Sequence, residues 1–374
     1  MFRHSFVIRH SSFVIIFTNV IAIPAPDFDL ENTLNSGQVF HWERIGNGFV
    51  GTISDLPIYV EQRGDVLKVR VGKGELDCLK QSSCGAAREE RRMVGRTVAH
   101  YFALDHPLAE ICASFPNDPI MIAARNFCRG LRIIRQPKWE CLATFICSSM
   151  KQVAHIRQIS LALRNRFGHQ RKIGSRVVHT FPSPQRIARA SESQLHECKL
   201  GYRAKNLRAT AQRVSFGECD LELCAALPDG DLRKNLCELP GVGVKIANCV
   251  MLFAYERLRA FPIDVWIERV LRQHYFPRRK KITAQQLREF SEAYFGEHGG
   301  YAQQYLFHHA RTALQRSGTA RDSSTALRSG RNDKRKDARR GGDNGERRRN
   351  TSNSDKIRIR SRIAAQVVSP AGLR

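Results

Sequence analysis

The chain has 374 residues and a formal net charge of +26 at pH 7, with 61 Lys and Arg against 35 Asp and Glu. This length accommodates two domains with buried cores. The excess of positive charge indicates a phosphate-bearing partner such as nucleic acid, although charge alone also fits a ribosomal protein or an anionic membrane surface. The 11 cysteines include no Cys-x2-Cys pair. This spacing argues against a zinc ribbon or finger, and the odd count indicates reduced thiols in a reducing compartment.

Residues 1–23 form an extension of doubtful function. Arg3 and Arg9 precede an apolar run from Phe13 to Ile23, which resembles a signal peptide and is too short to span a bilayer. We interpret the segment as a misassigned start or a non-functional extension rather than an export signal, because unpaired thiols and a nucleic-acid partner both argue against export.

Residues 24–115 show the short alternating patterns of an antiparallel β domain. Asn47-Gly48 and Arg63-Gly64-Asp65 supply turns between the strands. The charged, irregular segment 74–96 is predicted to be a loop. The predicted strands are 38–43, 48–53, 57–60 and 66–71.

Residues 116–316 change to a helical period and predict an all-α bundle, so the expected fold class is α+β with the β domain first. The predicted helices are 139–149, 153–166, 184–189, 202–214, 232–238, 244–254, 264–274, 284–294 and 301–316. Residues 317–374 carry 16 Lys and Arg against 6 Asp and Glu and predict a disordered basic tail. This tail either adds nonspecific phosphate affinity or has no function.

The most informative motif is a glycine-rich hairpin that opens a helix, Leu239-Pro240-Gly241-Val242-Gly243-Val244-Lys245. Glycines at 241 and 243 let backbone N–H groups approach an anion, and the helix N-terminus adds its dipole. With so basic a chain, we expect Gly241, Val242 and Gly243 to contact a nucleic-acid phosphate. The alternative is an ordinary corner between two helices with a surface lysine.

Lys245 and the later Asp264 suit the chemistry of base excision. A duplex base must be extruded before it is attacked. A neutral lysine amine that attacks the deoxyribose C1′ displaces the base and leaves a Schiff base, which permits strand cleavage by β-elimination. The amine must first lose its proton, which needs burial or cationic neighbours. Asp264 follows Pro262 at a predicted helix start, where it serves as a cap alone or also stabilises a cationic sugar.

The segment Leu239–Leu271 resembles the helix–hairpin–helix motif of the DNA glycosylase superfamily, with Phe261-Pro262-Ile263-Asp264 where the motif has Gly-Pro-Asp. Five further segments, in the same order along the chain, resemble the 8-oxoguanine DNA glycosylase branch. The resemblance extends from about Pro24 to Arg316. These segments are 35–42, 101–105, 145–149, 200–204 and 301–307.

This resemblance implies a bifunctional glycosylase and abasic-site lyase for base-excision repair. The enzyme would flip 8-oxoguanine out of double-stranded DNA, cleave its glycosidic bond through a Schiff base on Lys245 and nick the strand by β-elimination. Asp264 would be the electrostatic partner of that lysine. We expect no metal or organic cofactor, no membrane association and a monomer. The expected location is the cytoplasm or nucleoid in a bacterium and the nucleus in a eukaryote.

The resemblance also implies a pocket for the extruded base. Cys249, one turn after Lys245, would pack on one face of the oxidised guanine and Phe307 on the other. Gln303 would hydrogen-bond the Watson–Crick edge, and the carbonyl of Gly37 would accept the N7 hydrogen that 8-oxoguanine has and guanine lacks. The alternatives are that Cys249 and Phe307 are core residues, Gln303 a surface amide and Gly37 a turn.

The residues expected at the opposite strand depart from the family pattern. Tyr202 would be the wedge in the duplex, and Arg203 would read the orphaned base. Met150-Lys151-Gln152 stands where an asparagine run is usual, His155 replaces an arginine that reads the opposite cytosine, and Trp266 replaces a histidine. The changes at 150–152 and at 155 put a strict preference for opposite cytosine in doubt.

Two other functions remain open at this point. Another specificity within the superfamily is one, but no cysteine follows Cys249, which argues against the iron–sulfur members, and Lys245 argues against monofunctional ones. The other is a noncatalytic helix–hairpin–helix DNA-binding protein, against which the combination of Lys245, Asp264 and a matching pocket argues.

Overall fold

The computed structural model describes residues 20–72, 84–149, 151–279 and 281–312, all within the first of two units of the chain, Met1–Ser317. Residues 1–19, the whole of the expected tail and Met150 lie outside the described residues. No helix in the described ranges is both long and apolar enough to cross a membrane.

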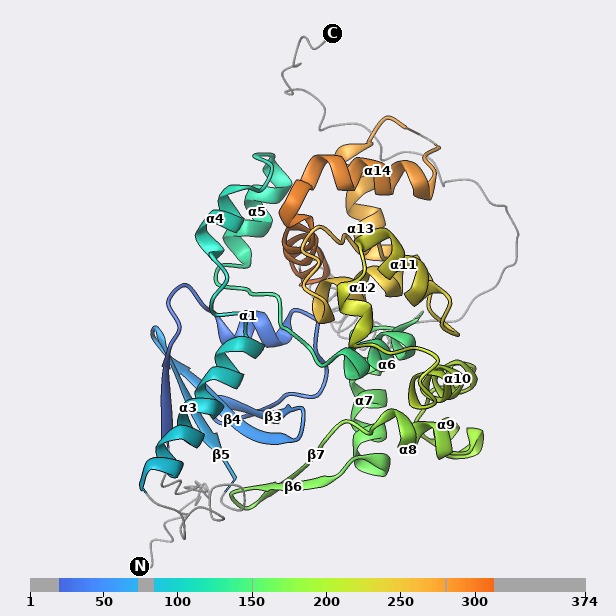
Figure 1. Ribbon diagram of the computed structural model, residues 1–374. Coiled ribbons are helices and arrows are strands. Elements are labelled where there is room, and N and C mark those ends of the chain that lie inside the picture. Colours follow the sequence, from blue (N-terminus) through green and yellow to red (C-terminus); the bar gives the residue numbers. More distant parts are fainter. Residues whose placement is uncertain (1–19, 73–83, 150, 280, 313–374) are drawn as a thin grey trace, which may run out of the picture. The chain divides into compact units, whose positions relative to one another are not determined.

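The N-terminal part is a five-stranded antiparallel sheet in the order β1-β5-β4-β3-β2 (Figure 1). Alternate side chains face the core, so Leu67, Val69 and Val71 of β5 are buried. The first strand lies across the expected boundary at residue 23. The strands are β1 Val20–Pro24, β2 Glu43–Ile45, β3 Gly48–Ile53, β4 Leu56–Arg63 and β5 Val66–Val71.

Two expectations for this part are wrong. Residues 38–42 are not a strand: all five side chains are buried, and Gln38 and His41 bond to main-chain groups of Ile134 and Thr52, so no exposed face exists. The C-terminal part of the predicted loop 74–96 is helical, in α3, Cys84–Tyr101. Its buried stripe of Val94, Val98 and Tyr101 packs in the core of the sheet, and the charged run 88–92 just before this stripe hides the helical period.

The remainder is mostly helical and encloses a second core. The helices are α1 Leu30–Asn35, α4 Leu108–Ala113, α5 Pro119–Phe127, α6 Lys138–Ser148, α7 Val153–Phe167, α8 Pro184–Arg189, α9 Glu192–Glu197, α10 Arg203–Ser215, α11 Asp229–Cys237, α12 Val244–Ala254, α13 Val265–Val270, α14 Ala284–Phe295 and a last helix over 299–312. A π-helical turn, Leu271–Tyr275, extends α13.

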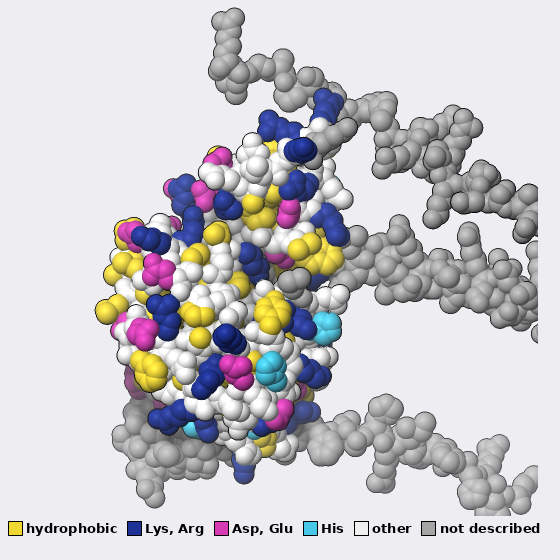
Figure 2. Space-filling view, turned by 90° about the vertical axis from the view of Figure 1, so that its right-hand side faces the viewer, with side chains coloured by type: hydrophobic (Ala, Val, Ile, Leu, Met, Phe, Trp, Pro, Cys, Tyr) yellow, Lys and Arg dark blue, Asp and Glu magenta, His cyan; other side chains and the backbone are white. Residues whose placement is uncertain are grey.

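The sequence predicted that this region is all-α, and that prediction is wrong. The region contains a two-stranded hairpin, β6 Gln170–Ile173 and β7 Arg176–His179. The tight turn between the strands contains Gly174, with a φ of +57°. Figure 2 shows the right-hand side of Figure 1, where Lys and Arg side chains are spread among hydrophobic and uncharged ones. Basic side chains therefore also lie on this face of the folded part of the chain.

A buried polar network joins the sheet to the helices. Arg164 of α7 donates to Thr52 Oγ1 of β3 at 2.9 Å and pairs with Glu140 of α6. His41 Nδ1 lies 3.4 Å from the same carboxylate. Burial raises the pKa of Glu140 and lowers the pKa of His41 well below its usual value. Because buried charges cost free energy unless they are paired, this network fixes the N-terminal loops against the helices.

Candidate active site

The glycine-rich hairpin lies between α11 and α12 and is held by α10. Gly241 has a φ of +81°, and a Cβ there would lie 2.8 Å from Asn206 Cβ, so both conformation and space require glycine. Thr210 Oγ1 donates to the Pro240 carbonyl at 2.9 Å. Gly241 and Gly243 are exposed, whereas the Val242 side chain is buried and its N–H donates to Leu239. Only the main chain of the glycines is therefore presented to a partner.

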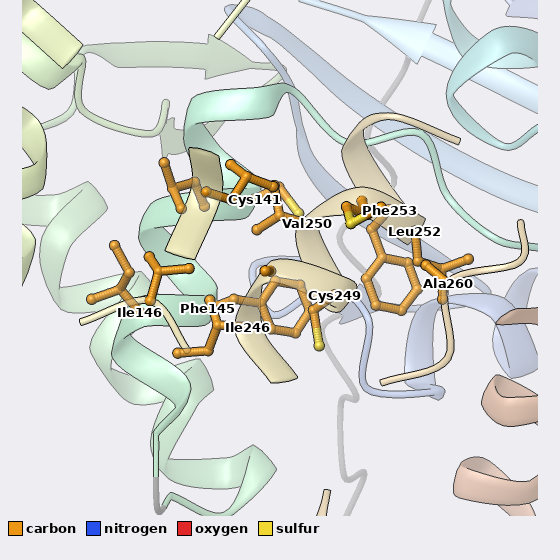
Figure 3. Close-up of a cluster of buried hydrophobic side chains, with 14 of the residues drawn as sticks. Cys141, Phe145, Ile146, Ile246, Cys249, Val250, Leu252, Phe253 and Ala260 are labelled. Atoms are coloured by element: carbon orange, nitrogen blue, oxygen red, sulfur yellow. The ribbon is translucent and has the colours of Figure 1, made fainter. Parts of the chain in front are cut away.

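Lys245 lies in the first turn of α12, over an aromatic ring of α6. Its Nζ is 5.3 Å from the centroid of Phe145, which stacks on Phe253 at 5.5 Å with an interplanar angle of 6°. Phe40 meets Phe145 edge to face at 6.3 Å. Figure 3 shows Phe145 of α6 in the same buried cluster as Cys249 of α12. The lysine amine is thus half-buried above a rigid aromatic stack.

Cys249 lies one turn after Lys245 on the same face of α12. Burial raises the pKa of the Cys249 thiol, against the opposing effect of the Lys245 charge. Cys249 is 3% exposed, so it is a neutral, buried thiol rather than a nucleophile. Its chemistry suits apolar contact with a planar ligand.

Asp264 is the N-cap of α13, as its position after Pro262 indicated. Its carboxylate accepts from the Ile267 N–H at 2.8 Å. Burial raises the pKa of Asp264, while the bond from Ile267 and then the charge of Lys245 oppose this rise. Asn248 of α12 donates to the Phe261 carbonyl at 3.4 Å and ties the two segments together. A half-buried carboxylate is thereby held within electrostatic reach of the amine.

Gly37 and Phe307 meet although 270 positions separate them in the sequence. Gly37 has a φ of +88°, and a Cβ built on it would lie 3.1 Å from Phe307 Cε1. Gln303 is 4% exposed, and its Oε1 is buried without a hydrogen-bond partner. An unpaired buried amide oxygen is costly, and a ligand with an N–H group would satisfy it.

The residues expected at the opposite strand are arranged unevenly. Tyr202 is 58% exposed, and His155 is exposed on α7. Arg203 is instead buried, donating from Nε to the Ser149 carbonyl at 2.8 Å and from Nη1 to the Leu200 carbonyl at 3.2 Å. Its guanidinium also stacks on Tyr202 at 4.3 Å. Arg203 therefore supports the exposed Tyr202 ring from within the protein.

Sequence reasoning missed two residues that build this site, Phe145 and Arg311. Phe145 lies in segment 145–149, which resembles the glycosylase family, but nothing in the sequence separation between Phe145 and Lys245 predicts that they meet. Arg311 does have a signal in the sequence, because it lies four positions after Phe307 on the same helical face. Its Cζ is 5.5 Å from that ring.

The described residues contain no group of three or more His, Cys, Asp or Glu side chains arranged to hold a metal ion. Two cavities lie elsewhere, one beside His41 and Arg164 and one beside Trp139 and Leu221. Neither cavity is lined by Lys245 or Phe307. The candidate site is therefore defined here by the contacts between its side chains and not by a cavity.

Comparisons with known proteins identify the family of the chain. Residues 20–142 match the N-terminal domain of 8-oxoguanine DNA glycosylase, and residues 143–294 match the HhH-GPD superfamily of base excision DNA repair proteins. A probable N-glycosylase/DNA lyase of Methanothermobacter thermautotrophicus is 29% identical over 77% of this chain and 95% of its own. An N-glycosylase/DNA lyase of Arabidopsis thaliana is 29% identical over 75% of this chain and 77% of its own.

A solved structure shows the same fold. The 8-oxoguanine glycosylase/lyase of Clostridium acetobutylicum, crystallised with double-stranded DNA that contains cytosine opposite 8-oxoguanine, is 27% identical, with a TM-score of 0.67. The match covers 77% of this chain and 93% of that one. The chain therefore belongs to the 8-oxoguanine DNA glycosylase branch of the HhH-GPD superfamily and is a bifunctional N-glycosylase/DNA lyase.

Proposed function

We propose that Lys245 and Asp264 are the catalytic pair with which this enzyme releases 8-oxoguanine from double-stranded DNA. The observation that carries the proposal is their position at the starts of helices α12 and α13, with the Asp264 carboxylate in the electrostatic field of the Lys245 amine. A lysine near a fixed, half-buried carboxylate suits a reaction that passes through a cationic sugar.

In the proposed reaction, the neutral Lys245 amine forms a bond to C1′ while the bond from C1′ to N9 of the base breaks. The electron pair leaves with the base, and the base takes up the proton that the attacking nitrogen gives up. Opening of the sugar ring leaves a Schiff base between Lys245 and C1′. Loss of a C2′ proton and of the 3′ phosphate oxygen then cleaves the strand by β-elimination, and hydrolysis frees the lysine. Asp264 stabilises the positive charge on the sugar.

We propose that the extruded base lies between Cys249 and Phe307. The unpartnered Gln303 Oε1 supports this placement, because the Watson–Crick edge of 8-oxoguanine offers N–H donors. Gly37 would accept the N7 hydrogen of the lesion through its carbonyl. The exposed glycines of the hairpin would bind a DNA phosphate by their main-chain N–H groups, and we propose that one molecule acts alone.

Borohydride trapping on an 8-oxoguanine duplex tests the proposal, because only a Schiff base is reduced to a stable cross-link. Lys245→Gln is expected to abolish trapping and base release while retaining lesion binding. The matched control is Lys205→Gln, which removes an exposed lysine of α10 next to Asn206 of the hairpin contact. Near-normal excision by the Lys245 variant would exclude it as the nucleophile.

A further inference from the structure

One face of the last helix, 299–312, carries the pocket residues at helical spacing. Gln303, Phe307 and Arg311 follow one another at intervals of four, so they form a single stripe. The first two already have proposed roles in binding the base. Arg311 has none, although it is 9% exposed and contacts both Phe307 and the loop at Gly37.

Three main-chain carbonyls around Gly37 are each held by a side chain. In the described part of the chain, the carbonyl of Gly37 itself accepts no hydrogen bond. The loop is thus fixed at its flanks and free at the one acceptor that faces the lesion in the proposed function. The three donor–acceptor pairs are Arg311 Nη2 to Asn35, Gln304 Nε2 to Ser36 at 3.0 Å and Gln136 Nε2 to Gln38 at 2.7 Å.

Arg311 is the donor of these three that also contacts the aromatic wall. Its Cζ lies 5.5 Å from the Phe307 centroid and 3.6 Å from the position of a Cβ at Gly37. Its guanidinium forms no ion pair with a carboxylate of the described residues, and its Nε is buried without a partner. Burying an unpaired cation costs free energy, so stability alone does not account for an arginine here.

We propose that Arg311 is a positioning residue for lesion selectivity, which holds the Gly37 carbonyl and the Phe307 ring in one fixed geometry. This inference rests on the proposed function. 8-Oxoguanine and guanine differ at N7, where the lesion has a hydrogen and the normal base a lone pair. A carbonyl fixed at N7 attracts the first and repels the second. If the loop can move away, the repulsion is relieved and the discrimination falls.

The test compares single-turnover excision of 8-oxoguanine with that of 8-bromoguanine, which also carries a substituent at C8 but has no N7 hydrogen. The wild type is expected to prefer 8-oxoguanine strongly. Arg311→Met, which keeps bulk but removes the donors, is expected to lower that preference at least tenfold. Arg311→Lys, which keeps a charge and a donor without the planar group over Phe307, is expected to lower it three- to tenfold.

Two controls separate positioning from general damage. Arg132→Met removes another buried arginine that donates to main-chain carbonyls, those of Ala103 and His106, and has an unpartnered Nε. It is expected to change the preference less than twofold. Cleavage of a preformed abasic site needs no base recognition, so its rate is expected to stay within twofold in every variant.

A preference within twofold of the wild type in Arg311→Met overturns the inference. If that variant does not fold, Arg311→Lys decides instead, and an unchanged preference there has the same meaning. Equal loss of rate on 8-oxoguanine and abasic duplexes also overturns it, since that result indicates a merely structural residue. Failure of the proposed function is distinct, because the wild type would then show neither excision nor trapping.

Discussion

The guanidinium of Arg311 donates a hydrogen bond to the main-chain carbonyl of Asn35, across 276 positions of sequence. Asn35 ends α1 in the part that matches the glycosylase N-terminal domain, whereas Arg311 lies beyond the region that matches the superfamily model. The Gly37 loop and Phe307, two parts of the proposed pocket, therefore come from opposite ends of the folded chain. In the proposed function Lys245 lies on α12, whereas the N7 contact depends on these two ends of the chain, so we expect mutation to separate the lysine chemistry from lesion selectivity.

Asp264→Asn is expected to lower single-turnover excision by orders of magnitude while the Tm stays equal or rises by up to a few degrees. Asparagine caps a helix as well as aspartate, and it removes a carboxylate whose raised pKa shows that its charge is unfavourable in the folded state. Thermal unfolding at pH 7 and excision rates on one preparation provide the measurement. A Tm drop of many degrees would assign Asp264 mainly to capping.

Gly37→Ala is expected to lower the Tm by a few degrees and to reduce excision of 8-oxoguanine at least tenfold. The positive φ costs a residue with a Cβ about 1–2 kcal/mol, and this Cβ would press on Phe307. Gly64→Ala is the matched control, because it has a φ of +56° with nothing within 4 Å. Gly64→Ala has the same backbone cost but no contact with Phe307, so its excision rate is expected to be normal. Similar excision rates in Gly37→Ala and Gly64→Ala would contradict a pocket role for Gly37.

The sequence predicted those elements whose signals are local. The bounds of β3, β5 and α12 agree with the structure because alternating side chains, turn dipeptides and a glycine-opened helix are read within a few residues. Helix α3 was missed because the stripe it buries is narrow and the charges beside it look like a loop. The helix α3 is stabilised by packing against the sheet, and a local sequence pattern carries no information about that packing.

The candidate site was predictable in its residue types but not in its contacts. The spacing of Lys245 and Asp264, together with the family resemblance, is enough to indicate a catalytic pair. The burial of Arg203 against the Ser149 carbonyl and the clamp of Arg311 on Asn35 have no such signal. Both depend on main-chain acceptors in distant segments, and a main-chain carbonyl has no signature in the sequence.

The stability of the protein is expected to fall as the pH is lowered from 6.5 toward 5. Burial is the largest cause that lowers the pKa of each of four histidines, and it takes that of His308 to about 4. In the unfolded chain these histidines have the ordinary pKa of about 6.5 and take up protons below that pH, whereas in the folded chain they stay neutral to a lower pH. The stability that the neutral histidines allow above pH 6.5 is therefore lost as the pH falls. The other three histidines are His41, His106 and His309.

Tm measurements from pH 7.5 to 5.0 check this expectation, with His308→Gln as the comparison. Removing one such histidine is expected to flatten the fall, because each fully titrating group contributes about 1.4 kcal/mol per pH unit. The two curves would be parallel if His308 were protonated equally in both states.

Deleting residues 317–374 is expected to weaken binding to undamaged DNA and to flatten its dependence on salt. The segment carries 16 Lys and Arg against 6 Asp and Glu, and each phosphate contact that is lost reduces counterion release. Excision at low salt is expected to remain, because the candidate site lies within the described residues. Binding titrations at several salt concentrations give the slope, and an unchanged slope would mean that the tail does not bind DNA.

Selectivity for the base opposite the lesion is expected to be weak. His155 is exposed on α7 but cannot supply the bidentate contact of an arginine, and Arg203 is occupied by the Ser149 and Leu200 carbonyls. A bidentate base contact contributes about 1–3 kcal/mol of discrimination. Single-turnover rates on duplexes with cytosine, adenine, guanine or thymine opposite 8-oxoguanine are therefore expected to lie within roughly tenfold, at about 1.4 kcal/mol per decade.

The same argument predicts a gain of selectivity. His155→Arg is expected to raise the preference for cytosine about tenfold. Two N–H donors of the arginine guanidinium match the acceptors of cytosine, whereas adenine, guanine and thymine would present donors or a differently shaped edge to them. Gln158→Arg is the control, since it adds the same charge to an exposed position of the same helix, one turn further on. If both variants raise the four rates equally, the effect is electrostatic attraction to DNA and His155 does not lie at the opposite base. A thousandfold preference for cytosine in the wild type would show that other residues read this base.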